Sequence, residues 1–297
     1  TFYKNTGLEK AIDHLYLEVD RAYRDGANIL ILTDRGVDEI RMPIPSLLAV
    51  SAVHQYLVRT KRRTSLALIL ESGEPREVHH FATLLGYGAS AVNPYLALDT
   101  IHQLIDSGML EKDYYAAVED YNHAVLSGIV KIASKMGIST LQSYRGSQNF
   151  EAIGISKEVI DTYFPHTVSR VEGITLKDIE ADTNALHNQA FDPLGYDVNT
   201  TLDSGGFHKE RSHKEKHLYN PKTIHLLQQA SRLGDYKLFK EFSETITQEE
   251  EGINLRGLLD FDFSKRKPIP LEEVEPVENI VKRFKTGAMS YGSIAVA

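Results

Sequence analysis

The chain has 297 residues, of which 42% are hydrophobic, so it is long enough to form one large or two modest globular domains with buried cores. Its formal net charge is −8 and no basic face stands out in the sequence, which argues against binding along a nucleic-acid backbone. The chain contains no cysteine, which excludes disulfides, cysteine-ligated zinc or iron–sulfur sites and a thiol nucleophile within it.

From the sequence we expect neither a signal peptide at the opening residues nor a membrane span. No run of residues approaches 18 apolar positions, and the opening residues TFYKNTGLEKAI lack the hydrophobic block of a signal peptide, so we expect a soluble chain. The sequence does not begin with Met and it ends at SIAVA. We interpret these ends as those of a fragment cut from a longer protein.

The first half of the chain alternates between helical periodicity and short apolar runs. Leu8–Arg24 has apolar residues at helical spacing, and Gly26 ends this helix. Further helices are expected from Ser46, which we predict to be the cap, to Val58, then through Leu85, over Tyr95–Asp106 and over Asp113–Lys135. The apolar runs predict four buried strands, of the kind covered on both faces, at Ala27–Leu32, Leu66–Leu70, Ala89–Val92 and Ile138–Leu141.

Four successive strand–loop–helix units imply a parallel sheet with right-handed crossovers. We therefore predict an α/β fold: an incomplete or rudimentary TIM-barrel-like parallel βα repeat with additional helices. Half of a (β/α)₈ barrel and an open sheet both fit this pattern. In either arrangement the functional loops lie at the carboxyl ends of the strands. These loops are 33–45, 71–75, 93–95 and 142–147.

The second half of the chain is less regular. Helices are predicted at Ser156–Tyr163 and Leu176–Gln189, and Ala190–Asn220 is read as a long surface loop or linker. A helical hairpin follows, formed by Pro221–Leu233 and Tyr236–Thr247 with Gly234 and Asp235 in the turn, then a short helix over Val277–Phe284 and a strand from Gly287. The expected division is 1–190 for the βα-repeat core, 191–220 for the linker, 221–267 for a helical extension and 268–297 for the start of another domain.

The stretch Lys135–Gly154 offers a possible anion site. We expect its strand to be followed by a polar loop containing Arg145 and then by a helix that opens near Ser147. Backbone N–H groups at such a helix start, together with one arginine, suit a phosphate. The alternative is that Ser147 caps the helix and Arg145 bonds nearby carbonyls as a structural clasp or at a domain interface.

Two groups of titratable residues suggest metal or acid–base chemistry, but their geometry favours simpler interpretations. The first group is Glu71, Glu74, Glu77, His79 and His80. Adjacent histidines on a helix point about 100° apart, so they cannot share a metal, and a solvated helix start is favoured. His208, His213 and His217 lie in a polar stretch that we expect to be an exposed loop. The basic cluster Arg59, Lys61, Arg62 and Arg63 is read as the last turn of a helix.

No nucleophile elbow, phosphate-binding loop or dinucleotide fingerprint is present, so the chain has no self-contained catalytic motif. The stretch GAMSYGS at 287–293 is different, because small residues with a Met on an early strand suit the floor of a flavin site. An ordinary buried first strand fits the same residues.

Four stretches carry a resemblance to a known family: IPSLLAVSAVHQYLV (44–58), LESGEPREVHHFATLLGYGASAVNPYLA (70–97), SKMGISTLQSYRGSQNFEAIGIS (134–156) and PLEEVEPVENIVKRFKTGAMSYGSI (270–294). They resemble the glutamate synthase family, in its central domain together with the opening of its FMN-binding domain. The resemblance covers nearly the whole chain, although Ala295, Val296 and Ala297 depart from the expected continuation.

The resemblance implies a role within a large enzyme that makes two glutamates from glutamine, 2-oxoglutarate and two electrons. The central domain of that family joins an amidotransferase domain to an FMN barrel, looks like a flavin barrel without flavin and helps form the internal ammonia route. The family's catalytic cysteine and the cysteines of its iron–sulfur cluster lie outside this region. The implied partners are those two domains and an electron donor, either an NADPH-oxidising subunit or ferredoxin. The implied location is the cytoplasm, or the stroma of a plastid.

Only five residues match a family stretch that borders FMN. They are Ala288, Met289, Ser290, Tyr291 and Gly292. We therefore expect no catalytic residue, no metal and no stoichiometric FMN in this chain alone. Two alternatives remain open: a free-standing barrel-like enzyme that binds a phosphorylated ligand near loop 142–147, and a protein-interaction module with a large exposed apolar patch.

Overall fold

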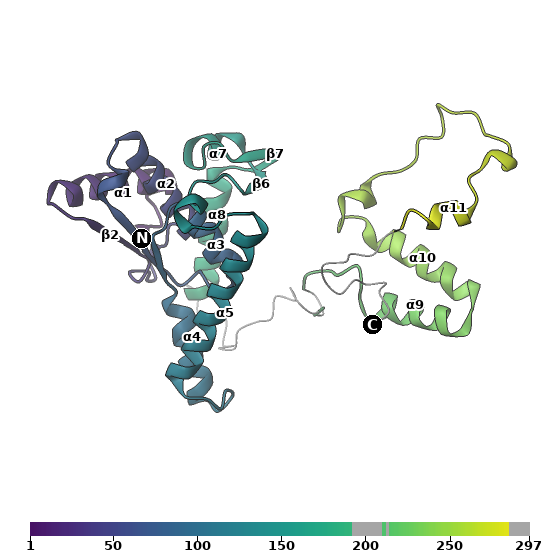
Figure 1. Ribbon diagram of the computed structural model, residues 1–297, viewed down its shortest axis with the longest axis horizontal. Helices are drawn as coiled ribbons and strands as arrows, with labels where there is room; N and C mark the ends of the chain where they lie inside the picture. The colour runs from purple at the N-terminus through teal and green to yellow at the C-terminus, as the bar shows by residue number, and fades with distance from the viewer. Residues whose placement is uncertain (192–209, 212–213, 285–297) are drawn as a thin grey trace. The chain divides into compact units, whose positions relative to one another are not determined.

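The computed structural model describes residues 1–191, 210–211 and 214–284. The chain forms two compact units, Thr1–Asn199 and Thr200–Ala297 (Figure 1). Within the described residues, no helix is both long enough and apolar enough to cross a membrane. The finer division of the chain at residues 190, 220 and 267 stays a prediction.

A parallel sheet of three strands lies at the centre of the first unit. It has the order β2-β4-β5, with β2 at Ile29–Thr33, β4 at Ala67–Glu71 and β5 at Ala91–Asn93. Three of the four expected strands are therefore confirmed, with their ends shifted by one or two residues. The parallel βα repeat predicted from these apolar runs is present.

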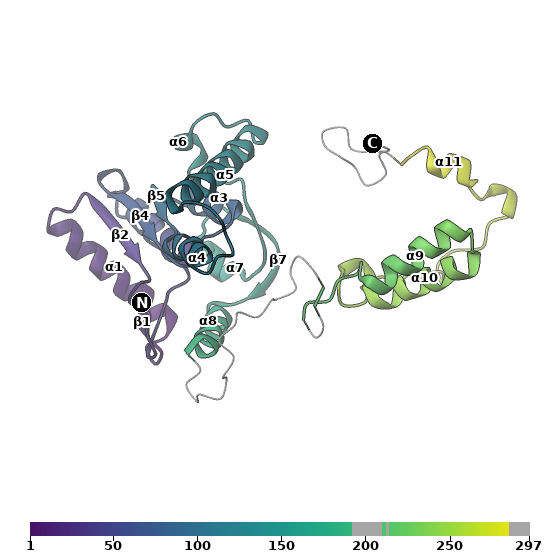
Figure 2. The ribbon, with the colours of Figure 1, turned by 90° about the horizontal axis from the view of Figure 1, so that it is seen from below.

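Three helices cover one face of this sheet. They are α1 (Leu8–Arg24), α2 (Ser46–Arg59) and α3 (Val78–Gly86), and both ribbon views show α1 alongside β2 (Figures 1 and 2). The strand register pairs Leu30 with Leu68 on the covered face. These leucines pack with Val50 and Val53 of α2 and Val19 of α1, which builds one buried cluster. Because successive side chains of a strand alternate between faces, the helices bury every second residue.

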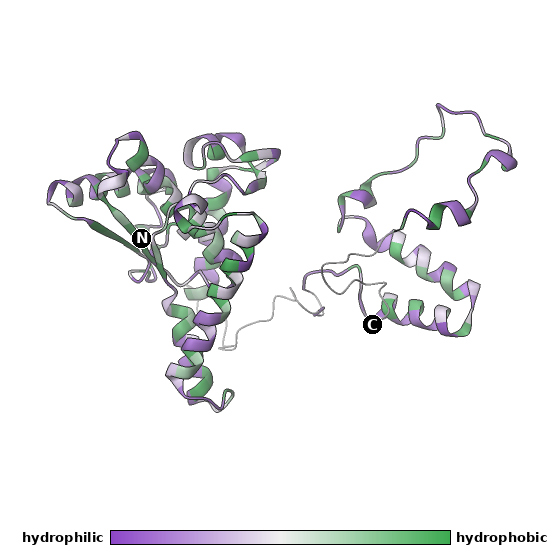
Figure 3. Cartoon of the chain, viewed as in Figure 1, coloured by the Kyte–Doolittle hydropathy of each residue, from purple (hydrophilic) through white to green (hydrophobic). Residues whose placement is uncertain are grey.

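The opposite face of the sheet is open within the first unit. On this face the register places Ile29 beside Ala67 and Ile31 beside Ile69, and Ile69 in turn lies beside Ala91. Ile29 is 56% exposed and Ile31 is 60% exposed, although their strand is among the hydrophobic segments of the chain (Figure 3). The prediction that these strands are covered on both faces is therefore wrong for this unit, because α1, α2 and α3 all lie on the other side.

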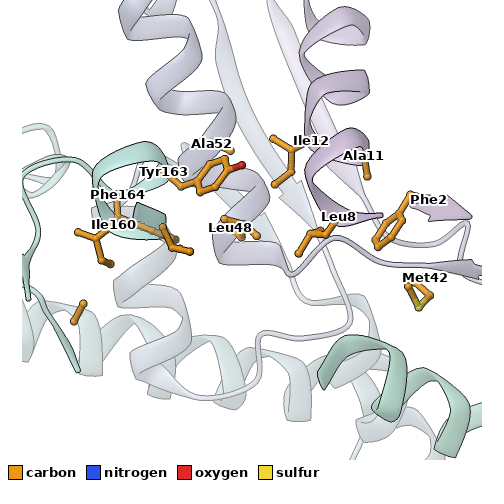
Figure 4. Packing of buried hydrophobic residues seen from close by; sticks show 12 residues of the cluster. Phe2, Leu8, Ala11, Ile12, Met42, Leu48, Ala52, Ile160, Tyr163 and Phe164 are labelled. Atoms are coloured by element: carbon orange, nitrogen blue, oxygen red, sulfur yellow. The ribbon is translucent and has the colours of Figure 1, made fainter. Parts of the chain in front are cut away.

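The remaining elements of the first unit surround this layer. They are β1 (Phe2–Tyr3), β3 (Arg41–Met42), α4 (Tyr95–Asp106), α5 (Tyr114–Lys135), α6 (Leu141–Tyr144), β6 (Glu151–Ile155), α7 (Lys157–Tyr163), β7 (Val168–Ile174) and α8 (Leu176–Phe191). A second buried cluster joins α1, α2 and α7 through Leu8, Leu48 and Tyr163 (Figure 4). The Ser51 hydroxyl of α2 donates to the Tyr163 carbonyl at 2.6 Å, which fixes α7 against α2.

The predicted fourth strand at Ile138–Leu141 is wrong. Gly137 has a φ of 71°, and the N–H of Ile138 donates to the Ala133 carbonyl at 2.9 Å, so Ile138 belongs to the C-terminal cap of α5. Thr140 already caps α6, because its hydroxyl accepts from the Ser143 N–H at 3.3 Å. Two consecutive caps leave no residues for a strand.

The helix expected to open near Ser147 is also absent, because residues 147–150 form no helix and β6 follows them. Strand β6 pairs in parallel with β7 in a separate two-stranded sheet. The described part of the chain thus has an α/β fold with parallel strands, but its three-stranded sheet does not close into a barrel. The TIM-barrel-like part of the prediction is not confirmed.

The second unit contains the predicted helical hairpin. Its helices are α9 (Pro221–Leu233) and α10 (Tyr236–Glu250), and Gly234 lies in the left-handed region between them. Asn220 caps α9 and Asp235 caps α10, as their positions before the apolar runs would suggest. Two short 3₁₀ helices at Leu255–Leu258 and Leu271–Glu273, and α11 (Val277–Val281), complete the described part. Most of the expected linker and the strand expected from Gly287 lie outside the described residues.

Candidate functional site

Three of the four loops singled out in the sequence meet at the carboxyl end of the three-stranded sheet. The register pairs Thr33 with Glu71 and Glu71 with Asn93, so the last residues of β2, β4 and β5 form one row. This row continues the open face, two residues beyond Ile31, Ile69 and Ala91 along the strands. The prediction that the loops 33–45, 71–75 and 93–95 gather at one edge is confirmed.

Glu71 is the centre of that row. Its carboxylate accepts hydrogen bonds from the Thr33 hydroxyl at 2.8 Å, the Arg35 Nε at 2.9 Å and the Asn93 side-chain amide at 3.2 Å. The hydrogen bond from Arg35 is the main reason why the pKa of Glu71 is lowered, and the Thr33 hydroxyl lowers it further. Glu71 is therefore held as a carboxylate with several donors around it.

Asp34 organises a second set of contacts beside the first. It accepts from the Ser72 hydroxyl at 2.6 Å, the Tyr95 hydroxyl at 2.7 Å and the Gly73 N–H at 3.1 Å. Burial and the bond to Asp34 raise the pKa of Tyr95 to about 12. The Arg35 guanidinium lies over the Tyr95 ring, 3.9 Å from Arg35 Cζ to the ring centroid, and so connects the Asp34 and Glu71 contacts.

Glu74 extends this network to the start of α2. Its carboxylate accepts from the Ser46 N–H at 2.9 Å and from the Ser46 hydroxyl. The prediction that Ser46 itself caps the helix is wrong, because Ser46 is the first helical residue and a carboxylate from another loop binds its N–H. An acidic group at this position also complements the helix dipole.

The network at the carboxyl end holds the loops together. Its polar groups are bonded to one another, so few of them are available for catalysis. The carboxylates of Asp34, Glu71 and Glu74 accept from neighbouring donors, and the hydroxyls of Ser72 and Tyr95 donate to Asp34. No imidazole is bonded to a hydroxyl here, so the arrangement lacks the base of a nucleophilic pair. Among the described residues, no three His, Asp or Glu side chains are grouped as a metal site.

The acidic and histidine cluster of the sequence is divided between two roles. Glu71 and Glu74 belong to the network, whereas Glu77 and His80 form the capping box of α3. The His80 Nδ1 accepts from the Glu77 N–H at 3.3 Å, which confirms the predicted helix start. His208 and His213 lie outside the described residues.

The fourth loop, 142–147, lies elsewhere. The Gly146 N–H donates to the Gly86 carbonyl at 2.8 Å, and the Ser147 hydroxyl donates to the Tyr144 carbonyl at 2.7 Å. Arg145 lines a depression with Asn28 and Ala67, at the amino ends of β2 and β4. The prediction that this loop shares an edge with the other three is wrong, because no strand precedes it.

The basic cluster after α2 is also more than a last helical turn. Only Arg59 belongs to that turn. Arg62 forms an ion pair with Asp20, 2.6 Å between its Nη1 and the carboxylate, and lies over the Tyr23 ring. Arg63 begins a 3₁₀ helix and turns toward the depression at the amino ends of the strands.

The residues predicted to border FMN cannot be compared with the network. Ala288, Met289, Ser290, Tyr291 and Gly292 lie outside the described residues. Conversely, the sequence interpretation did not single out Thr33, Asp34, Arg35 or Tyr95 individually. The available signal was their place directly after apolar runs, at the carboxyl ends of predicted parallel strands.

The comparisons with known proteins agree on one family. Residues 1–156 match the family described as "Glutamate synthase central domain", and residues 217–297 match the one described as "Conserved region in glutamate synthase". Over 97% of its length, the chain is 50% identical to the glutamate synthase [NADPH] large chain of Bacillus subtilis. The chain belongs to the glutamate synthase family.

Other members of the glutamate synthase family match the chain over a similar length, at lower identity. The chain is 44% identical to the glutamate synthase [NADH] of Schizosaccharomyces pombe over its whole length, and 38% identical to the ferredoxin-dependent glutamate synthase 2 of Synechocystis over 97% of it. It spans 19% of the Bacillus protein, 14% of the Schizosaccharomyces protein and 20% of the Synechocystis protein. Since relatives named for NADPH, NADH and ferredoxin all match, this region does not distinguish the electron donor.

Proposed function

We propose that this chain is the central connecting region of a glutamate synthase. In this proposal it links the glutamine amidotransferase domain to the FMN domain and forms part of the internal ammonia route. The complete enzyme makes glutamate from glutamine and 2-oxoglutarate, and this region is not catalytic by itself. The observation that carries the proposal is the sheet with one covered and one open face.

The open face is apolar, and we expect another part of the protein to pack against it. Ile29 and Ile31 are each more than half exposed, and Ile69 and Ala91 extend the same surface across the sheet. Covering one isoleucine side chain is worth roughly 1.5–3 kcal/mol, so a bare row of such residues is costly. Because the chain spans about a fifth of the Bacillus relative's length, other domains of the same polypeptide are the natural cover.

The carboxyl-end network supports a structural role beside that face. Its carboxylates are engaged by Arg35, Tyr95, Ser46 and neighbouring hydroxyls and amides. Because the polar groups of this network bond to one another, the network forms a rigid surface that keeps its shape when a neighbouring domain moves. A rigid surface of this kind suits the lining of a route for a small neutral molecule better than it suits acid–base chemistry.

The second unit also has apolar side chains that its own described residues leave exposed. Phe261 is 82% exposed, Phe263 is 79% exposed and Leu271 is 83% exposed. This stretch precedes the expected first strand of the FMN domain. Its exposure is consistent with a segment that runs between two larger domains and packs on them.

The cofactors of the proposed enzyme are assigned outside the described residues. The stretch Ala288–Gly292 would contribute only the first strand of the FMN site. Because the chain contains no cysteine, the ligands of an iron–sulfur cluster must come from other parts of the protein. An NADPH-oxidising subunit or ferredoxin would supply the electrons. The proposed location is the cytoplasm, or a plastid stroma in a photosynthetic eukaryote.

The proposal is tested in the full-length protein with Ile31→Asp, which places a charge on the open face. We expect glutamine hydrolysis to continue while ammonia escapes, so that fewer glutamates form per glutamine consumed. Glutamate formation from saturating external ammonium should change much less. Both products and free ammonia are measured in one assay. The matched control is Leu17→Asp on α1, where the native side chain is already 62% exposed.

An Ile31→Asp protein that keeps the wild-type ratio of glutamate formed to glutamine consumed would contradict the proposal. A loss of both activities with intact folding, without release of ammonia, would also contradict the route. In that case the open face would serve assembly alone.

A further inference from the structure

A basic depression lies at the amino ends of β2 and β4, opposite the carboxyl-end network. Its lining includes Asn28, His54, Arg63, Ser65, Ser90 and Arg145. No Asp or Glu is among the residues that line it, in a chain whose net charge is −8. The depression is therefore lined by basic side chains and by no acidic side chain.

Arg63, which lines the depression, is held in a fixed orientation. Its Nε donates to the His54 Nδ1 at 2.9 Å, and its two terminal nitrogens donate to the Leu66 carbonyl at 2.6 Å and the Gly88 carbonyl at 2.8 Å. A guanidinium has five N–H donors, so two remain for a ligand. Burial lowers the pKa of Arg63, and the nearby Arg145 lowers it further.

His54 adds a neutral donor beside Arg63. Burial, Arg63 and Arg145 lower the pKa of His54 to about 4, so the ring is neutral at pH 7. Because Nδ1 accepts from Arg63, the ring proton lies on Nε2. A Cβ on Gly88 would lie 2.3 Å from the His54 Nδ1, and Gly88 has a φ of 122°. This close approach depends on glycine and fixes the ring against the loop.

Arg145 supplies the second cation and is free to bind. Within the described residues, its guanidinium forms no hydrogen bond or ion pair, and it affects the pKa values of both His54 and Arg63. Its backbone is positioned by the bond from the neighbouring Gly146 N–H to the Gly86 carbonyl. Two guanidinium groups that repel each other are stabilised most simply by an anion between them.

We propose that the depression formed by His54, Arg63 and Arg145 is a binding site for an oxyanion group of a small molecule, either a phosphate or a carboxylate. The site offers N–H donors from three side chains, and the forked guanidinium geometry matches two oxygens of one group. Ser65 and Ser90 also line the depression. This site is separate from the proposed connecting role, because it uses the other end of the strands.

The test measures hydrogen–deuterium exchange of the full-length protein, with inorganic phosphate or succinate added at constant ionic strength. We expect protection of the peptides that contain residues 63–66 and 142–147, saturating as the anion is titrated. Arg145→Ala should weaken the binding about tenfold or more, since a hydrogen bond to a charged group is lost. Arg145→Lys should retain part of it. Arg24→Ala, an exposed arginine on α1, is the matched control and should leave binding unchanged.

Arg145 is a suitable position for this test because its side chain has no protein partner to lose, so its variants should fold normally. Stronger protection by phosphate than by succinate, or the reverse, would identify which oxyanion the site prefers. The absence of protection by both anions would falsify the proposal, as would equal protection in Arg145→Ala. If these peptides are protected without any anion and Arg145→Ala exposes them, another part of the polypeptide occupies the site and the small-molecule proposal is wrong.

Discussion

The two ends of the three-stranded sheet differ in whether their charged side chains are paired. At the carboxyl end, Asp34 and Glu71 are surrounded by hydroxyl, amide and guanidinium donors from the neighbouring loops. At the amino end, Arg63 and Arg145 lie near each other with no carboxylate among the residues that line the depression. The same strands therefore present one electrostatically satisfied edge and one unsatisfied edge.

This difference separates a structural site from a binding site. A satisfied network contributes to folding, because removing any acceptor leaves donors without partners. An unsatisfied cluster costs free energy in the absence of a ligand and regains it when a ligand of opposite charge binds. The carboxyl end lies where α/β proteins commonly bind ligands, yet in this chain the amino end has the free donors.

The largest effect is expected for Asp34→Ala, which disrupts the paired network at the carboxyl end of the sheet. This change removes the acceptor for the Ser72 hydroxyl, the Gly73 N–H and the Tyr95 hydroxyl. We expect a loss of about 3–4 kcal/mol in the local free energy of opening, because partly buried donors are left unpaired. Native-state hydrogen exchange of peptides from β4 and the following loop measures it.

The matched control is Asp25→Ala, which removes an exposed carboxylate after α1 and should change the free energy by less than about 0.5 kcal/mol. Equal exchange in wild type and Asp34→Ala would show that the carboxyl-end network does not hold the loops together.

A smaller effect is expected from pH at the amino end. The folded-state pKa of His54 is lowered to about 4, whereas an unfolded histidine titrates near 6.5. The unfolded state therefore binds a proton first as the pH falls, and the contribution of neutral His54 is present above pH 6.5 and lost between pH 6.5 and 4. The loss is about 2–3 kcal/mol. It is measured as the free energy of unfolding across this range.

His54→Gln is the comparison, because its amide oxygen can still accept from Arg63 Nε but does not titrate. Wild type should lose stability relative to this variant as the pH falls from 6.5 to 4. A constant difference across the range would mean that His54 is protonated as easily in the folded as in the unfolded state. Added phosphate, if bound as proposed, should raise the pKa of His54 and reduce the effect.

The smallest effect is expected for Arg35→Met at the exposed edge of the network. The Arg35 side chain is 50% exposed and its ion pair with Glu71 is solvated, so the thermal midpoint at pH 7 should fall only slightly. Arg35 lowers the pKa of Glu71, so this contribution is present above about pH 4.5 and lost as the pH falls through the folded-state pKa. The midpoints of wild type and variant should converge once the pH is below the folded-state pKa of Glu71. Divergence at low pH would contradict this role for Arg35.

Local sequence patterns were sufficient for most individual elements. The apolar spacing of Leu8–Arg24 and the turn chemistry of Gly234 and Asp235 gave helices that the structure confirms. Helix bounds follow from side-chain spacing and from caps that lie within a few residues, so they can be predicted without tertiary contacts. The strand predicted at Ile138–Leu141 failed because a short apolar run can equally close one helix and begin another.

The candidate site was only partly accessible from the sequence. The alternation of strands and helices placed the loops after β2, β4 and β5 at one edge, since parallel strands share their direction. The specific pairing of Asp34 with Tyr95 and of Glu74 with Ser46 joins residues 61 and 28 positions apart, and no local pattern encodes it. The distance of Arg145 from that edge follows directly from the missing fourth strand.

By itself, the sequence determined the parallel βα repeat of the first unit, the helical hairpin of the second and the resemblance to glutamate synthases, because periodicity, caps and long matching stretches are properties of neighbouring residues. Only the tertiary structure decided that the sheet leaves one face open, that its carboxyl-end acids are paired and that Arg63 and Arg145 meet at its amino end. These features depend on strand register and on which face the helices cover. Both are set by packing between segments far apart in the chain.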